Sequence, residues 1–201
     1  MTVTEAPSTA RSTDSETARV EAALDALLAG RIDVATIVQS ELSPSKPRAG
    51  VEYLPICDDE LRVAVASDHP LATRTSVALE ELRAEPFLIT EVAGTCADSN
   101  VVLHAFRDAG FEPTVRFSSD DYQALQGMAA SGIGVALIPT MALTSSRSDV
   151  VVLPLRGRAP ARQILAAVRA GEQDPLVEHL VESLRRAARA LAGVPTLAVV
   201  A

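Results

Sequence analysis

The stretch Met128–Pro139 restricts the fold of this chain more than any other part of its sequence. It reads Met-Ala-Ala-Ser-Gly-Ile-Gly-Val-Ala-Leu-Ile-Pro, so an apolar helix end meets two glycines and passes at once into a strand. Gly132 suits the left-handed conformation just past a helix, and Gly134 allows the strand to start close to its neighbours. The strand Val135–Ile138 is apolar throughout, which is typical of a strand covered on both faces. Because ligands of open α/β sheets bind beyond the carboxyl ends of strands, recognition is expected around Pro139–Thr140.

A weaker copy of this pattern lies near the start of the chain. Apolar residues at helical spacing predict an amphipathic helix from Ser15 to Ala29, with Gly30 as its stop and a strand over Ile32–Val38. The repetition suggests two related lobes. The order strand, helix, strand, helix, strand over Phe87–Ile138 predicts a parallel sheet with right-handed crossovers, so the fold class is α/β.

Two further segments shape the expected fold. Short strands are predicted at Val51–Ile56 and Leu61–Ala66, on either side of a solvated acidic turn, Asp58–Glu60. Asp174-Pro175 starts a long helix that ends near Gly193. Its apolar stripe is predicted to consist of Leu176, Val177, Leu180, Val181, Leu184, Ala187 and Leu191.

Composition excludes several classes of function. With 201 residues and 48% hydrophobic residues the chain is expected to be globular, while 3% aromatic residues and no Trp disfavour aromatic stacking platforms for bases. A net charge of −8, with Lys46 as the single lysine, argues against binding a nucleic-acid backbone. Cys57 and Cys96 fit no metal spacing and are expected to be reduced thiols, so no metal or other cofactor is predicted. Without an apolar membrane span or a signal peptide, the expected location is the cytoplasm.

Three blocks of sequence, in this order and spacing, resemble one known family. They are Leu-Leu-Ala-Gly-Arg-Ile-Asp-Val-Ala (Leu27–Ala35), Leu-Arg-Val-Ala-Val-Ala-Ser-Asp-His-Pro-Leu-Ala (Leu61–Ala72) and Met128–Pro139. Over roughly Val20–Leu191 the chain resembles the effector-binding domain of LysR-type transcriptional regulators. The resemblance implies a type 2 periplasmic-binding-protein-like fold, in which two α/β lobes joined by two crossover strands hold a small effector between them.

The resemblance also implies how the chain is divided. The first lobe is expected to comprise residues 19–61 and 162–192, and the second lobe residues 62–161, with a disordered tail at 1–18 and a further tail at 193–201. Family members begin with a winged helix-turn-helix, and their effector domain opens with a strand, a helix and a strand that this sequence does not match. We therefore expect an N-terminally truncated first lobe with an exposed sheet edge, and no direct nucleic-acid binding by this chain.

The resemblance places the ligand-binding residues at strand ends that face the cleft. The candidates are Val38, Gln39, Thr90, Glu91, Ser118, Ser119, Asp120, Ile138, Pro139 and Thr140. Since helix starts favour carboxylates, a small organic metabolite, and in particular a carboxylate, is the expected ligand. An alternative is that Thr90 and Ser118 only cap or flank helices, because Ser118 and Asp121 resemble a capping box.

Three functions stay open at this point. The first is a small-molecule effector-binding domain that does no chemistry, lacks its own DNA-binding module and pairs as a homodimer or as a mixed dimer with a full-length relative. The second is a small enzyme on a related two-lobed fold, for which only Glu91 and Asp120 are acid or base candidates; Ser131 lacks the first glycine of a nucleophile elbow. The third is a non-functional fragment of a regulator.

Overall fold

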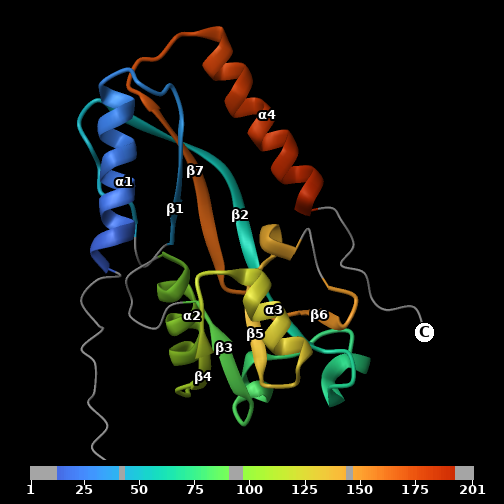
Figure 1. Cartoon of the computed structure of the whole chain (residues 1–201). Helices are drawn as coiled ribbons and strands as arrows, with labels where there is room; N and C mark the ends of the chain where they lie inside the picture. Colours follow the sequence, from blue (N-terminus) through green and yellow to red (C-terminus); the bar gives the residue numbers. More distant parts are fainter. Residues whose placement is uncertain (1–12, 41–43, 91–96, 144–146, 193–201) are drawn as a thin grey trace, which may run out of the picture.

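Helices and strands alternate along most of the chain in the structure, a computed structural model that describes residues 13–40, 44–90, 97–143 and 147–192 (Figure 1). The helices are α1 (Thr13–Leu28), α2 (Ala97–Asp108), α3 (Tyr122–Ala130) and α4 (Pro175–Ala192). The strands are β1 (Ala35–Gln39), β2 (Val51–Ala66), β3 (Pro86–Ile89), β4 (Thr114–Ser118), β5 (Val135–Pro139), β6 (Val150–Pro154) and β7 (Ala161–Arg169). Short 3₁₀ helices are η1 (Pro70–Thr73), η2 (Leu79–Leu82) and η3 (Thr140–Leu143). Helix α1 starts inside the segment that was expected to be a tail up to residue 18.

The long strand β2 joins two groups of elements. The sheet order is β1-β7-β2-β5-β3-β4, and β6 also pairs with β2. Residues 51–60 of β2 pair with β7, whereas residues 61–66 pair with β5 and β6. We call α1, β1, β7, α4 and residues 51–60 of β2 the first half, and the elements from residue 61 to β6 the second half. Figure 1 shows the first half above the second, with β2 and β7 passing between them.

The acidic turn predicted at Asp58–Glu60 is wrong. These residues continue β2, and Asp58, Asp59 and Glu60 pair with Gln163, Arg162 and Ala161 of β7. Asp59 is buried instead of solvated. Acidic residues disfavour a strand by local propensity, but β7 provides both ladder hydrogen bonds and the cation of Arg162. The ladder is interrupted only by a bulge between Pro55 and Cys57, where the Pro55 carbonyl accepts a 3.0 Å hydrogen bond from Arg185 Nε.

The parallel sheet predicted in the second half is confirmed. Strand β3 pairs in parallel with β4 and with β5. One face of this sheet packs on α2 through an aromatic cluster in which the Phe87 and Phe106 rings lie 4.5 Å apart. The other face packs on α3 through Leu125 and Ala129. The apolar strand β5 is buried along its whole length, as its composition predicted.

Two helices cover opposite faces of the first-half strands. Helix α1 packs Leu24 and Leu27 against Ile37 and Leu165, and Gly30 follows it with φ of 67°. The amides of Gly30 and Arg31 donate to the carbonyls of Leu27 and Ala26, which closes the helix as expected. Among the described strands β1 pairs only with β7, so it is an edge strand.

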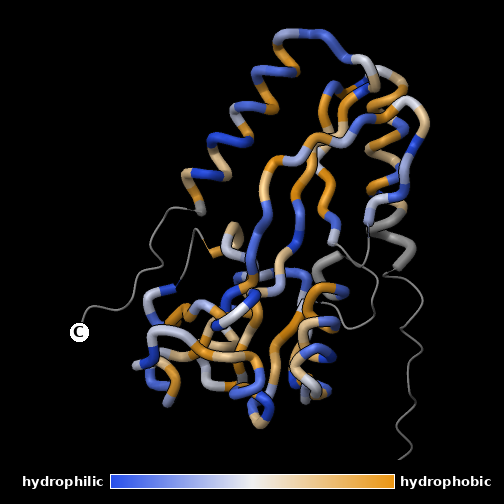
Figure 2. The backbone as a smooth tube through the Cα atoms, turned by 180° about the vertical axis from the view of Figure 1, so that it is seen from behind, coloured by the Kyte–Doolittle hydropathy of each residue, from blue (hydrophilic) through white to orange (hydrophobic). Residues whose placement is uncertain are grey.

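Helix α4 is less buried than its apolar stripe predicted. Val177 and Val181 pack against Val168 of β7, whereas Leu176 and Leu180 are 77% and 46% exposed. The prediction of a single inward stripe is wrong for these two leucines, because the described residues place no element over that side of α4. It is also wrong for Ala187, which is exposed, while its neighbour Ala188 is buried. Hydrophobic and hydrophilic segments alternate along α4 in Figure 2.

Candidate functional site

A pocket of about 360 Å³ lies at the carboxyl end of β1, where β2 and β7 run toward the second half. Strand β1 contributes Gln39, and its register partner on β7 is Gln163. The full lining is Gln39, Ser45, Tyr53, Pro55, Ile56, Cys57, Asp58, Gln163, Ile164 and Leu165. Of the candidates predicted from sequence, Gln39 lines this pocket and its neighbour Val38 does not.

Hydrogen bonds hold the polar wall of the pocket in place. Gln39 Nε2 donates to Gln163 Oε1 at 3.0 Å, and Gln39 Oε1 accepts from the Ser45 amide at 2.9 Å. The Tyr53 hydroxyl donates to the Lys46 carbonyl at 3.3 Å. Burial, and then the charge of Glu21, raise the pKa of Tyr53, so this hydroxyl stays protonated at neutral pH. Hydrogen bonds within the chain therefore orient the Gln39 amide and the Tyr53 hydroxyl in the pocket wall.

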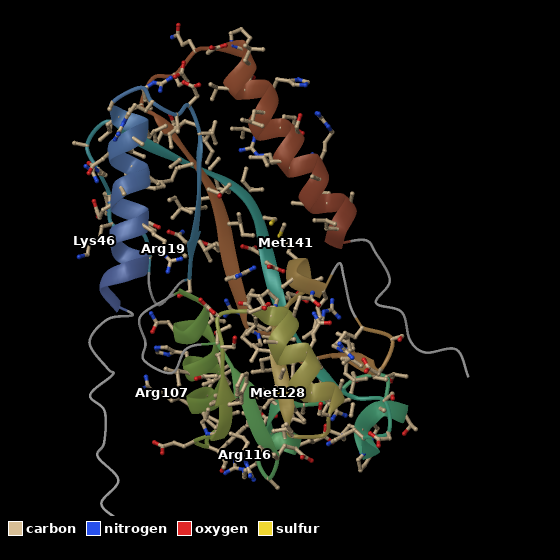
Figure 3. The ribbon with its side chains drawn as sticks, viewed as in Figure 1. Arg19, Lys46, Arg107, Arg116, Met128 and Met141 are labelled. Atoms are coloured by element: carbon tan, nitrogen blue, oxygen red, sulfur yellow. The ribbon has the colours of Figure 1, made fainter. Side chains whose placement is uncertain are left out.

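The thiol of Cys57 connects the pocket to the second half. It lines the pocket and its Sγ donates to Met141 Sδ of η3 at 3.7 Å. Figure 3 shows Met141 beside β2, between the two halves. Burial raises the pKa of Cys57, and the charges of Asp59 and Asp58 raise it further. A protonated thiol is a poor nucleophile, so Cys57 contributes an uncharged group to the pocket wall at pH 7.

Thr90 follows the carboxyl end of β3 and is only 7% exposed. Its Oγ1 atom is buried without a hydrogen-bond partner in the part of the chain that the structure describes. Helix α2, the next described element, contacts β1 and β7, the strands that carry Gln39 and Gln163. Buried hydroxyls are nearly always paired, so Thr90 Oγ1 is an exception among the described residues and is free to bond a further polar atom.

Ser118, Ser119 and Asp120 lie at the end of β4, the outermost strand of the path. The capping box predicted from Ser118 is wrong. Asp121 is the N-cap of α3 and accepts from the Gln123 amide at 2.8 Å, while Ser119 Oγ accepts from the Asp121 amide. Since β4 extends through Ser118, the helix begins three residues later than a Ser118 cap would require.

The end of β5 is bound to β2. Ile138 and Pro139 are buried, and Ile138 packs in the core beneath α3. Thr140 Oγ1 donates to the Glu60 carbonyl at 2.9 Å and accepts from Arg62 Nε at 3.4 Å. Thr140 thus lies at the point where β2 changes partners. Glu91, the remaining candidate, lies outside the described residues.

Sequence reasoning missed the buried ion pair between Asp59 and Arg162. Asp59 Oδ2 accepts from Arg162 Nε at 3.0 Å, and Asp59 Oδ1 accepts from the Met141 amide at 3.0 Å. The available signal was that apolar segments with strand character flank the acidic residues of β2 on both sides. The pairing itself was not predictable, because Asp59 and Arg162 are 103 residues apart in the sequence.

Some kinds of site are absent from the described part of the chain. Residues 13–40, 44–90, 97–143 and 147–192 contain no group of three or more His, Cys, Asp or Glu side chains placed to hold a metal ion. No helix within them is long and apolar enough to span a lipid bilayer.

Two halves joined by β2 and β7, with a pocket lined by β1, the loop after it, β2 and β7, define a binding domain of the type 2 periplasmic-binding-protein-like class. Residues 14–189 match the model of the LysR substrate binding domain, so the chain belongs to this family of transcriptional regulators.

Curated and solved relatives agree with this assignment. The HTH-type transcriptional regulator MetR of Escherichia coli (strain K12) is 35% identical over 162 residues, which are 80% of this chain and 49% of the relative. A hydrogen peroxide-inducible genes activator of Dickeya chrysanthemi is 30% identical, over 86% of this chain and 54% of the relative. The effector binding domain of BenM with its effector benzoate superposes with a TM-score of 0.71 at 25% identity, over 86% of this chain and 76% of that one. The chain thus spans about half the length of the curated relatives it matches.

Proposed function

We propose that this domain binds a small organic acid between two lobes and reports the binding by a change in their arrangement, without catalysing a reaction. The lobes would comprise residues 19–61 with 162–192, and residues 62–161. A ligand that prefers one arrangement shifts the population toward it, and subunit contacts in a complete regulator would pass that shift to DNA-binding modules. The cytoplasm is the location that fits this function.

The observation that carries the proposal is the buried hydroxyl of Thr90, which has no partner among the described residues. A buried polar atom without a partner costs free energy, and a ligand oxygen would satisfy it. Thr90 precedes α2, which contacts the strands that carry Gln39 and Gln163. The superposed BenM domain holds benzoate, a small carboxylate, which supports this ligand class.

The proposed contacts come from both halves of the molecule. Gln39 and Thr90 are the principal ones, because one lines the pocket and the other is buried without a described partner. The other candidate contacts are Val38, Glu91, Ser118, Ser119, Asp120, Ile138, Pro139 and Thr140. Thr140 is the weakest donor, since its hydroxyl is already engaged with Glu60.

Thermal melting tests the ligand class. The purified chain is melted alone and with benzoate and a panel of other small carboxylic acids at millimolar concentration. Binding at 100 times Kd would stabilise the folded state by about 2.7 kcal/mol, which raises Tm measurably. A cooperative melt that no acid raises would remove the ligand class, and a chain without a cooperative melt would support a non-functional fragment.

A matched pair of substitutions tests the site. Thr90→Val keeps the shape of the side chain and removes a hydroxyl without a described partner, so the ligand-free Tm should hold or rise. The Tm increase caused by the acid should shrink. Thr36→Val, at an exposed position on β1, should leave that increase unchanged. An equal increase in wild type and Thr90→Val would reject the site.

The proposed partner state is a homodimer, or a mixed dimer with a full-length relative. The edge strand β1 and the exposed leucines of α4 leave surface on the first half that a partner could cover. Sedimentation velocity over a concentration series tests this, since a dimer dissociates on dilution and a monomer does not change.

A further inference from the structure

We infer that Asp59 is a positioning residue that sets the angle between the two halves, acting through a clamp formed by Asp59, Arg162, Met141 and Tyr122. Its link to ligand binding rests on the proposed function, whereas its effect on the halves does not. The clamp lies at the junction where β2 changes partners.

Asp59 lies next to that junction. It is paired with Arg162 of β7 in the sheet register, and Leu61, two residues further along β2, already pairs with Pro139 of β5. Arg162 is likewise near the start of β7, one residue after Ala161. The pair therefore lies on the two crossing strands at the point where the first half ends.

The Asp59 carboxylate binds a different element with each oxygen. Oδ2 accepts from Arg162 at 3.0 Å, and Oδ1 accepts from the Met141 amide of η3 at 3.0 Å. The Arg162 guanidinium also lies 6.0 Å from the centroid of the Tyr122 ring, at the start of α3. One carboxylate thus ties β2 to β7 and to η3, and its partner reaches α3.

Because the Asp59 carboxylate is buried, these contacts restrict how η3 can be oriented relative to β2 and β7. The Asp59 side chain is 1% exposed and that of Arg162 is 12% exposed. If η3 moved away from β2, Asp59 Oδ1 would lose the hydrogen bond from the Met141 amide in a buried place, and a buried charge is costly when it loses such partners. The contacts therefore favour one angle between η3 and the crossing strands.

The neighbours of Asp59 touch the candidate ligand site. Cys57 and Asp58 line the pocket, and the Cys57 thiol contacts Met141. On the other side, the Glu60 carbonyl accepts from Thr140. A ligand that displaced the pocket wall would strain the same segment of β2 that holds η3. Ligand binding could in this way change the angle between the two halves.

The alternative role for the pair is stability alone, and three variants separate the two. Asp59→Asn keeps an oxygen for the Met141 amide but removes the charge. Asp59→Leu with Arg162→Met removes the directional contacts and keeps apolar bulk, and such replacements of buried ion pairs are often neutral or stabilising. Asp149→Asn is the matched control, because Asp149 pairs with Arg147 through two 2.8 Å hydrogen bonds at an exposed site inside the second half.

The measurement is the distance distribution between the halves, obtained by pulsed electron spin resonance on the full chain without ligand. Nitroxide labels are attached to p-acetylphenylalanine in place of Arg31 and Arg116, both exposed and in different halves. We expect one narrow distribution for the wild type and for Asp149→Asn. The Asp59→Leu/Arg162→Met distribution should be about twofold wider, with Asp59→Asn intermediate.

A double variant that melts cooperatively and keeps the narrow distribution would overturn the inference. If the double variant does not fold, the width for Asp59→Asn decides in the same way, since this side chain keeps its size and the Met141 bond. Benzoate is then added to the wild type. If benzoate changes neither Tm nor the distance distribution, benzoate is not a ligand of this domain. The comparison of the variants without ligand still tests whether Asp59 sets the angle between the halves.

Discussion

Gly134 and Pro86 approach so closely that a Cβ atom on Gly134 would lie 2.4 Å from the Pro86 carbonyl oxygen. This contact joins the starts of β5 and β3, which pair in parallel in the second half. The atom in the way belongs to the backbone, so it cannot rotate aside as the end of a flexible side chain could.

Gly134→Ala should therefore push the two strands apart and destabilise the fold by roughly 2 kcal/mol, as overpacking does in other cores. Gly127→Ala is the control, because Gly127 lies in α3, where an added Cβ atom would meet nothing within 4 Å. That change should stabilise the chain by about 0.5–1 kcal/mol, since alanine is the better helix former. Urea unfolding of both variants checks the opposite signs, and a neutral Gly134→Ala would contradict the close approach.

Glu172 predicts a pH dependence of stability. A hydrogen bond from the Asp174 amide, followed by one from Arg169, holds the pKa of Glu172 below its ordinary 4.5. A carboxylate with a lowered folded pKa stabilises the fold above the unfolded value, and this contribution is lost as pH falls below about 4.5 through the folded value.

Glu172→Gln should accordingly be less stable than wild type at pH 7, and the gap should narrow as the pH falls below about 4.5. The urea midpoints of wild type and Glu172→Gln are measured at pH 7 and at a pH below about 4.5, and the difference between the two proteins is compared at the two pH values. A gap of the same size at both pH values would show that the charge of Glu172 is not the cause.

Cys57 should react slowly with iodoacetamide in the folded chain. Burial raises the pKa of its thiol, and Asp59 and Asp58 add to this effect, so little thiolate exists at neutral pH. Alkylation is followed by mass spectrometry in the Cys96→Ser variant, in which Cys57 is the single cysteine left to react. The rate should climb only at alkaline pH, whereas the urea-unfolded chain should react readily near pH 8.5. Equal rates for both states at neutral pH would contradict a raised pKa for this half-buried thiol.

Helix α4 should respond very differently on its two sides. Leu176 is exposed, so Leu176→Gln should change the free energy of unfolding by less than about 0.5 kcal/mol. Val181 is buried against the first-half sheet, and Val181→Ala should cost about 2 kcal/mol. Urea unfolding measures both. A large loss for Leu176→Gln would mean that this side of α4 is covered in solution, and dilution experiments would then identify a second copy.

Much of the fold could be predicted because its signals are local. The turn at Gly30, with φ of 67°, repeats at Gly132 with φ of 70°, and in each case a strand follows the turn. Glycine adopts this conformation without strain, so a glycine after an apolar helical stripe identifies the join by itself. Candidate strand ends followed from the same reasoning, although their ligand contacts remain predictions.

The errors concern residues whose partners lie far along the chain. Asp59 is bonded to Arg162, 103 residues away, and a strand through three acidic residues is disfavoured until that partner is present. Similarly, Leu176 and Val181 look alike in the apolar pattern of α4, and only packing on β7 distinguishes them.

The amino-acid sequence alone determined the order of helices and strands, the glycine joins and the parallel sheet, because backbone conformation and hydrophobic periodicity act over a few residues. The tertiary structure decided that β2 is one continuous strand, that Asp59 is buried in a clamp and that the Thr90 hydroxyl is left without a described partner. Burial and pairing depend on which distant segments meet, and this is settled only when the whole chain packs.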